Sequence, residues 1–241
     1  MEWVLLTWLS PIEPELDLLF EPVHHSDVGL ASRSRDVAIS RVVSGDMDER
    51  NLVIDVVDNG GQWTHREWRM LRYLGVDTQI IGNDTPVDEL RDLDGLLLSG
   101  GAARVGLTGE LGNCAAFLEM DLPILGICAG HQFMARHYGG DCAEAVNPEF
   151  GAMEISLVNG GGVIFENTPE RQIVWESHND EVTVVPDGFV ITAGSDSCRV
   201  QGMEDVSRQR FGLQFHPEVN DSEFGAEMMK NFVSFCRKTQ F

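Results

Sequence analysis

The sequence predicts an α/β fold in which a mostly parallel, doubly wound sheet is flanked by helices and carries a small β-rich insertion. The first observation is an alternation of short apolar segments with helix-like segments over residues 51–140, a spacing typical of parallel sheets. The second is a change after Gly140 to shorter β segments separated by turns. The third is a cysteine, Cys128, between two glycines where an apolar strand passes into a helix. In such sheets the active site lies at the carboxyl ends of the strands.

The first half of the predicted domain supplies the parallel strands. Apolar, β-branched runs predict strands at residues 52–57, 78–81, 95–98 and 123–127. Helical spacing and helix-breaking residues predict helices at residues 64–74, 85–90 and 110–119, with a further one from just after Ala129. Turn-forming residues 58–61 and 99–101 each follow a strand, so we expect both turns and Cys128 at the same edge of the sheet.

The second half is expected to leave the parallel sheet, return to it, and place His216 at its end. Turn signals divide it into β segments at residues 154–158, 162–165, 173–175, 181–185, 189–193 and 211–215. A final amphipathic helix is expected over residues 222–238, with Ser222 as its N-cap and with Met228, Phe232 and Phe235 facing the core.

Residues 1–46 do not follow this pattern. They mix three prolines (Pro11, Pro14 and Pro22) with scattered charges and show no sustained hydrophobic period. The segment is either an extra arm for a partner or a disordered leader, an artefact of an upstream start codon, with Met47 as the natural start; we favour the leader. Residues 47–241 are then expected to form one domain with one hydrophobic core.

The chain is strongly acidic. Its formal net charge is −22, and Lys230 and Lys238 are its only lysines. Such a charge argues against nucleic-acid binding, because phosphates would be repelled. Acidity spread along the chain with so little lysine resembles proteins from salt-loving organisms; the alternative is an ordinary acidic cytosolic protein.

Cysteine usage and the N-terminal residues indicate a soluble, cytoplasmic protein. Five cysteines without framework spacing predict free thiols in a reducing compartment. No metal-ligand spacing is present, since His24 and His25 are adjacent in a polar segment. The first ten residues carry no positive charge and are too short to span a membrane.

Cys128 and His216 are the candidates for nucleophile and base. A lone cysteine among apolar residues is most often an inert core thiol. Here, however, it occupies a sharp strand-to-helix turn, where the helix N-terminus aims free N–H groups at the sulfur and at a developing oxyanion. The downstream segment FGLQFHPE (residues 211–218) is a strand that ends in His216, with Glu218 two residues later to orient the imidazole. Together the two segments predict a Cys–His–Glu triad.

Four motifs occur in the order found in class I, triad-type glutamine amidotransferases: SGG (residues 99–101), GICAGHQ (126–132), SHNDEV (177–182) and GLQFHPEV (212–219). The chain resembles this family over about residues 51–240, which implies a flavodoxin-like sheet. Within the family, DNGGQ (residues 58–62) and SHNDEV most resemble the separate glutaminase subunit of archaeal GMP synthases.

The resemblance implies that the chain hydrolyses glutamine, with Cys128, His216 and Glu218 as its triad. The oxyanion hole would be formed by the backbone N–H groups of Gly101 and Ala129. Further positions of the family's glutamine pocket correspond to Gln132, Ser177, His178 and Asp180. Gln132 is alternatively an ordinary polar helix residue, and the other three face either the glutamine pocket or the synthetase.

The resemblance also implies a partner. The ammonia would pass to a separate ATP-pyrophosphatase (synthetase) subunit that converts XMP to GMP. Because the chain has no P-loop motif, ATP and Mg²⁺ are expected on that subunit, and no cofactor or metal is expected here.

Two residues depart from the family pattern. Ala102 stands where the family usually has proline, which is expected to loosen the oxyanion loop, and Ala129 stands where a larger residue is common. The alternatives are a glutaminase component of anthranilate or aminodeoxychorismate synthase, a Cys-elbow peptidase or chaperone of similar architecture, and a non-catalytic regulatory subunit. The SHNDEV segment argues against the first, the FHPE segment against the second, and the complete triad against the third.

Overall fold

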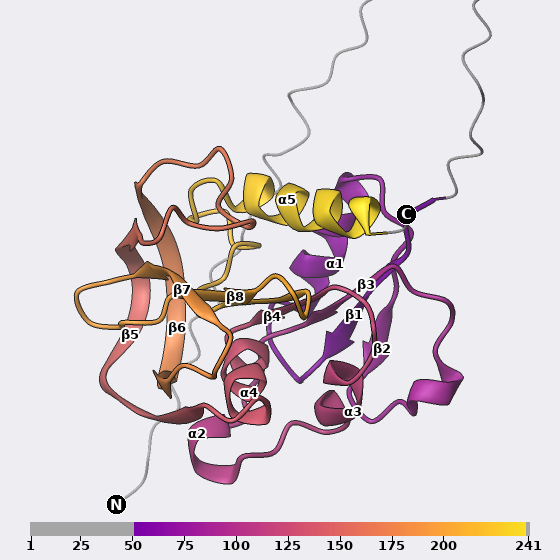
Figure 1. The fold of residues 1–241 in the computed structure, drawn as a ribbon, viewed down its shortest axis with the longest axis horizontal. Coiled ribbons are helices and arrows are strands. Elements are labelled where there is room, and N and C mark those ends of the chain that lie inside the picture. The colour runs from indigo at the N-terminus through magenta and orange to yellow at the C-terminus, as the bar shows by residue number, and fades with distance from the viewer. Residues whose placement is uncertain (1–50, 240–241) are drawn as a thin grey trace, which may run out of the picture. The chain divides into compact units, whose positions relative to one another are not determined.

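The computed structural model describes residues 51–239 (Figure 1). The predicted leader, residues 1–46, lies outside the described residues, so its boundary with the domain stays a prediction. The strands are β1 (Ile54–Asp58), β2 (Ile80–Gly82), β3 (Gly95–Leu98), β4 (Ile124–Ile127), β5 (Asp141–Leu157), β6 (Arg171–Val184), β7 (Val190–Gly194), β8 (Gly202–Asp205) and β9 (Arg210–Leu213). The helices are α1 (Thr64–Tyr73), the 3₁₀ turn η1 (Val87–Glu89), α2 (Val105–Thr108), α3 (Cys114–Leu118), α4 (Ala129–His137) and α5 (Gly225–Lys238).

Within residues 51–239 the strands form one nine-stranded sheet in the order β2-β1-β3-β4-β9-β8-β7-β5-β6. The strands from β2 to β9 pair in parallel, and those from β9 to β6 pair antiparallel. The predicted α/β class and doubly wound parallel half are therefore confirmed. The predicted β-rich insertion lies between β4 and β9 in the chain, and its strands continue the same sheet.

Helices cover both faces of the parallel strands: α1 and α5 lie on one face, and α3 and α4 on the other (Figure 1). Each face has its own apolar cluster. Leu71, Met228 and Phe232 belong to the first cluster, and Phe117 and Met134 to the second. The central strands are buried on both faces, which is why they read as continuous apolar runs without alternation. The predicted inward positions of Met228 and Phe232 are confirmed, whereas Phe235 is only partly buried.

Several predicted elements are wrong in detail. The strand expected at residues 162–165 is a turn, because Gly160, Gly161 and Gly162 all have positive φ angles that a strand does not accommodate. The helix expected at residues 110–119 is only α3, and that at residues 85–90 is only η1. The short elements α2 and β8, and the first part of β5, were not predicted, because their residues lack a clear apolar period.

Ser222 is not the N-cap of α5. The helix begins at Gly225 after Phe224, whose φ is 56°. The Ser222 hydroxyl instead donates to the His216 carbonyl oxygen (2.7 Å) and accepts from the Trp175 N–H (2.8 Å). It therefore ties the turn that carries His216 to strand β6.

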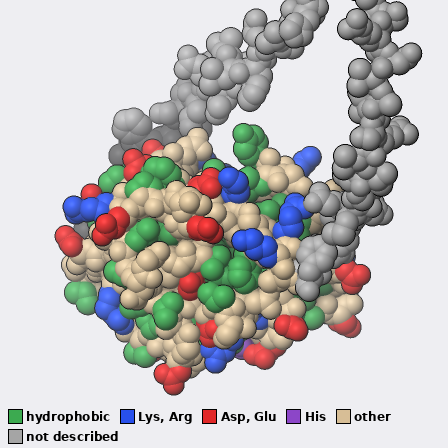
Figure 2. All heavy atoms as spheres, turned by 45° about the horizontal axis from the view of Figure 1, so that its top comes forward, with side chains coloured by type: hydrophobic (Ala, Val, Ile, Leu, Met, Phe, Trp, Pro, Cys, Tyr) green, Lys and Arg blue, Asp and Glu red, His purple; other side chains and the backbone are tan. Residues whose placement is uncertain are grey.

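Charged side chains are scattered over the surface. On the face drawn in Figure 2, Asp and Glu side chains lie among Lys and Arg side chains and separate hydrophobic patches. This agrees with acidity that is spread along the sequence.

Candidate active site

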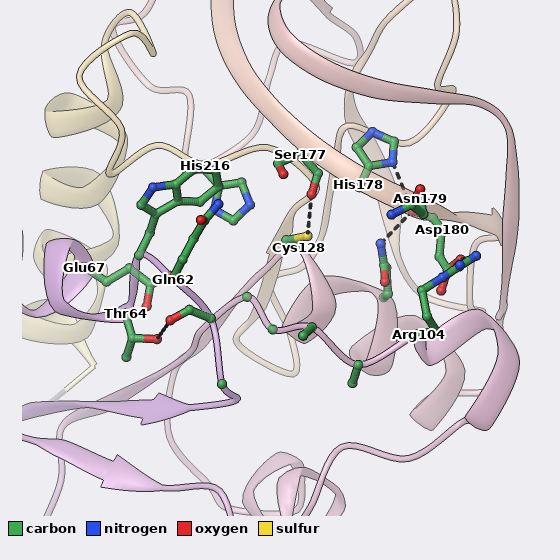
Figure 3. A pocket seen from close by; sticks show the side chains of 18 of the residues that line it. Gln62, Thr64, Glu67, Arg104, Cys128, Ser177, His178, Asn179, Asp180 and His216 are labelled. Carbon is green, nitrogen blue, oxygen red and sulfur yellow. Dashed lines mark hydrogen bonds and ion pairs between the residues drawn. The ribbon is translucent and has the colours of Figure 1, made fainter. Parts of the chain in front are cut away.

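A cavity of about 320 Å³ opens at the carboxyl ends of the parallel strands (Figure 3). The loops after β1, β3, β4 and β9 meet there, and the middle of β6 forms a further wall. Among the residues that line it are Gly101, Cys128, Gln132, Ser177, His178, Asp180 and His216. The tertiary structure thus brings together residues that lie far apart in the sequence.

Cys128 occupies the strained turn between β4 and α4. Its φ and ψ angles are 50° and −105°, a region that costs a non-glycine residue about 1–3 kcal/mol. A Cβ atom at Gly126 would lie 2.7 Å from the Gly130 carbonyl carbon, and one at Gly130 would lie 2.4 Å from the Leu98 oxygen. Both glycines are therefore needed for the close approach that lets the turn form and exposes the sulfur to the cavity.

His216 lies between Cys128 and Glu218. Its Nδ1 is 2.7 Å from Glu218 Oε1, and Cys128 is within hydrogen-bonding reach of the same ring. Burial alone would lower the pKa of His216, but the Glu218 charge and the hydrogen bonds to Cys128 and Glu218 outweigh burial and raise this pKa well above its usual value. The geometry gives a thiol, a base and an orienting carboxylate in one chain of contacts.

Two residues that the sequence analysis missed lie against His216 or beside it in the cavity. The Trp63 ring meets the imidazole edge-on, with ring centroids 4.3 Å apart. Glu67 lines the same cavity and is 1% exposed, and its burial, together with the nearby Glu218 charge, raises its pKa well above the usual range. The sequence carries no clear signal for Glu67, because an acidic residue near the start of an amphipathic helix is expected on its solvent side.

Of the two predicted oxyanion residues, Gly101 lies in the loop after β3 and Ala129 directly follows Cys128. Asn59 holds the SGG loop after β3: its N–H donates to Ser99 Oγ (3.1 Å) and its Nδ2 donates to Ser99 O (2.8 Å). Gly101 follows in that loop and lines the cavity. Ala129 is the first residue of α4, so its N–H has no acceptor within the helix. Gly101 and Ala129 as the oxyanion donors therefore stay a prediction.

Gln132 and Ser177 both line the cavity, and their contact with glutamine stays a prediction. Gln132 Nε2 donates to Asp180 O (2.6 Å) and to Gln214 Oε1 (3.1 Å), so the protein occupies its amide hydrogens. The Ser177 carbonyl oxygen lies 3.8 Å from Cys128 Sγ, which makes the backbone of Ser177 its contact with the nucleophile. Gln132 belongs to helix α4 and Ser177 to strand β6, which runs without a break through the SHNDEV segment and joins the two β segments predicted at residues 173–175 and 181–185.

The side chains of His178 and Asp180 have protein partners. The Asp180 carboxylate accepts from Arg104 Nε (2.8 Å) and Nη2 (2.6 Å) and from the Gly106 N–H (3.1 Å). His178 Nδ1 is 3.0 Å from Asp180 O, and its Nε2 is 2.8 Å from Glu149 Oε2. Both residues also line the cavity, and their contact with glutamine stays a prediction.

A second Cys–His–Glu cluster lies in the described part of the chain: Glu149, His178 and Cys198. The sequence did not reveal it, because its members come from three separate segments. All three are buried, and burial raises the pKa of the Cys198 thiol, so this sulfur is a poor nucleophile. Cys198 and Glu149 also do not line the cavity of Cys128. Cys128 is therefore the candidate nucleophile.

The chain belongs to the glutamine amidotransferase class-I family, whose sequence model matches residues 55–235. It is 46% identical to the glutamine-hydrolyzing GMP synthase subunit of Thermoplasma acidophilum over 187 residues, which cover 77% of this chain and 93% of that protein. It is 43% identical to the subunit of the same name from the haloarchaeon Natronomonas pharaonis over 183 residues, covering 76% and 97% of the two chains.

A solved structure of a relative is similar to this chain in fold and in sequence. The crystal structure of a Thermoplasma acidophilum protein, described as the corresponding GMP synthase subunit, matches with a TM-score of 0.74 at 45% identity. The match covers 79% of this chain and 96% of that one. None of the helices over residues 51–239 is long and apolar enough to cross a membrane.

Proposed function

We propose that this chain is the glutaminase subunit of a two-subunit GMP synthase. It hydrolyses glutamine to glutamate and ammonia and delivers the ammonia to a separate ATP-pyrophosphatase subunit, which converts XMP to GMP. The observation that carries the chemistry is the contact chain Cys128–His216–Glu218 at the cavity. The names of the relatives support the assignment to GMP synthesis.

In the first half-reaction Cys128 attacks the side-chain amide carbon of glutamine. His216 holds the thiol proton, the new S–C bond forms, and the carbonyl electrons move onto oxygen. When the C–N bond breaks, His216 gives the proton to the nitrogen, which leaves as ammonia. Because Glu218 bonds to Nδ1, it keeps Nε2 as the ring nitrogen that takes and returns the proton.

The backbone N–H groups of Gly101 and Ala129 stabilise the oxyanion. Removing one donor of such a hole typically costs about 3–4 kcal/mol of barrier. In the second half-reaction a water molecule attacks the thioester and His216 takes its proton. The C–S bond then breaks, the sulfur leaves with a proton, and glutamate is released.

The cavity walls account for glutamine binding. Since the protein occupies the amide hydrogens of Gln132, its Oε1 is the atom that can accept a hydrogen bond from the substrate. The Ser177 carbonyl oxygen lies beside the sulfur and can orient the substrate amide N–H₂. His178 and Asp180 support this wall from behind through their protein contacts.

The partner supplies the nucleotide chemistry. The sequence has no P-loop motif, so ATP and Mg²⁺ belong on the ATP-pyrophosphatase subunit, and the proposal includes no cofactor or metal in this chain. Phe150 lines the cavity and is 60% exposed, which fits a mouth that the partner covers while ammonia passes between the subunits. All five cysteines are free, which supports the reducing cytoplasm as the site of action.

The test measures glutamine hydrolysis in concentrated salt for the wild type and for Cys128→Ala. Each is tested alone and with the ATP-pyrophosphatase subunit, ATP, Mg²⁺ and XMP. We expect hydrolysis that needs Cys128 and is much faster with the XMP-loaded partner. Hydrolysis that needs Cys128 but ignores XMP would remove the GMP assignment and favour another amidotransferase, such as an anthranilate or aminodeoxychorismate synthase component. Hydrolysis that persists in Cys128→Ala would overturn the assigned nucleophile.

A further inference from the structure

Behind the β6 wall of the cavity lies a closed polar cluster that the proposed mechanism does not use. Its centre is His178, whose side chain is 0% exposed, and the side chains of Glu149 and Glu176 facing it are 1% and 0% exposed. In Figure 3 the His178 ring points away from Cys128, and a dashed line joins it to Asp180. His178 is thus a fully buried histidine on a wall of the active site.

Both ring nitrogens of His178 face acceptors. Nδ1 is 3.0 Å from the Asp180 carbonyl oxygen, an atom that only accepts, so Nδ1 carries a hydrogen. Nε2 is 2.8 Å from Glu149 Oε2 and 3.4 Å from Glu176 Oε2. Burial alone would raise the pKa of Glu149, but the hydrogen bonds from His178, Ser197 and Ser195 lower it. The His178 ring is therefore held between the Glu149 carboxylate and the Asp180 carbonyl oxygen.

The Asp180 carbonyl connects His178 to the glutamine pocket. The same oxygen accepts from Gln132 Nε2 at 2.6 Å, and Gln132 is the residue whose Oε1 remains for the substrate. Asp180 is fixed on its other side by Arg104 and the Gly106 N–H. Any shift of the Asp180 carbonyl therefore moves the Gln132 amide directly.

The geometry of the cluster fits hydrogen bonds between its members better than a bound metal ion. Glu149, His178 and Cys198 have the right chemistry for zinc. However, Glu149 already accepts from four donors: His178, Ser195, Ser197 and Gln201. In addition, Nε2 and Oε2 are 2.8 Å apart. Two nitrogen or oxygen ligands of tetrahedral zinc lie about 3.3 Å apart when each is at about 2.0–2.1 Å from the metal.

We propose that His178 is a positioning residue for the glutaminase reaction. Held by Glu149, it fixes the Asp180 carbonyl and, through it, the Gln132 amide, without touching glutamine. This inference rests on the proposed function, because it concerns the same pocket. It assigns the central histidine of the SHNDEV segment to the rear of the pocket, where it acts on substrate binding more than on the chemical step.

Two substitutions of His178 each keep one of its two hydrogen bonds and remove the other. In His178→Asn, the Nδ2 of asparagine takes the place of Nδ1 and keeps the Asp180 bond while losing the Glu149 bond. In His178→Gln, the Nε2 of glutamine takes the place of the ring Nε2 and keeps the Glu149 bond while losing the Asp180 bond. Cys198→Ser is the matched control, because it alters the same buried cluster and leaves the His178–Asp180 bond in place.

Steady-state glutaminase kinetics of the complete two-subunit enzyme, with thermal unfolding and bound zinc measured on each variant, provide the test. We expect His178→Gln to raise KM for glutamine about tenfold, with a smaller change in kcat, because one buried hydrogen bond to the Asp180 carbonyl is lost. Cys198→Ser should keep KM within about twofold of the wild type. His178→Asn should raise KM less than His178→Gln does, because it keeps the Asp180 bond but loses the support of Glu149.

Three outcomes would overturn the proposal. The first is an equal change of KM in His178→Asn and His178→Gln that follows their loss of thermal stability. The second is an unchanged KM in His178→Gln. The third is stoichiometric zinc in the wild type that both variants lose, which would make the cluster a metal site. A wild type without Cys128-dependent hydrolysis would instead overturn the proposed function itself, and this inference with it.

Discussion

Replacing Glu218 with glutamine tests which ring nitrogen of His216 must carry the hydrogen for the triad to work. The Glu218 carboxylate accepts the Nδ1–H of His216 at 2.7 Å, and its other oxygen, Oε2, is buried without a hydrogen-bond partner among the described residues. Glutamine has the same shape, but it must place an amide N–H₂ at one of these two positions. A buried N–H₂ without an acceptor is costlier than a buried carbonyl oxygen without a donor. We therefore expect the N–H₂ to face Nδ1.

The tautomer decides the size of the effect. Losing only the charge weakens the His216 hydrogen bond by about 1.5 kcal/mol, the difference between a charged and a neutral bond, and would lower kcat about tenfold. An N–H₂ facing Nδ1 goes further, because it turns Nδ1 into an acceptor and puts the ring hydrogen on Nε2, which then cannot take the Cys128 proton. In the Ser-His-Asp template this error costs about 10⁴ in kcat. For Glu218→Gln we expect a loss near the larger figure.

The assay is kcat for glutamine hydrolysis by the two-subunit enzyme across pH, with ¹⁵N NMR of the His216 ring to read the tautomer. In the wild type, His216 should stay protonated to a pH well above the usual histidine pKa, because the Glu218 charge and the bonds to Cys128 and Glu218 outweigh burial. The alkaline limb of the residual Glu218→Gln activity should lie at lower pH. A variant with kcat within threefold of the wild type, or with an unchanged tautomer, would refute this reasoning.

Two further substitutions test the walls of the site. Because the pKa of Glu67 is raised in the folded state, the fold keeps a proton that the unfolded chain loses above its ordinary pKa of about 4.3. Wild-type stability should therefore fall as pH rises from about 4.3 to the raised pKa of the folded state. Glu67→Gln should remove this fall, seen by urea unfolding at several pH values, and should leave kcat/KM within about threefold at neutral pH; an unchanged pH slope would mean that Glu67 is ionised in the fold. Gly130→Ala places a Cβ 2.4 Å from the Leu98 oxygen. It should cost about 1–3 kcal/mol of stability and lower kcat through the displaced turn, and wild-type behaviour in both measurements would show that the turn can relax freely.

Local patterns account for the parts that were predicted correctly. The alternation of buried strands and helices before Gly140 predicts the parallel half of the sheet, because each unit is encoded by neighbouring residues. The cysteine turn and the FHPE segment each carry their own signature of small or rigid residues. The sequence could not show that the segment after Gly140 extends the sheet, since this depends on the pairing of β4 with β9 and of β5 with β7, which joins residues far apart in the chain.

The sequence by itself determined the family, the elbow that presents Cys128, and the pairing of His216 with Glu218, because each depends on residues close together along the chain. Only the tertiary structure decided the roles of the SHNDEV side chains. His178 turns toward Glu149 and Asp180 toward Arg104, and both partners come from segments far away in sequence. Burial of charged groups depends on what covers them, and this is set by packing between elements and not by spacing within them.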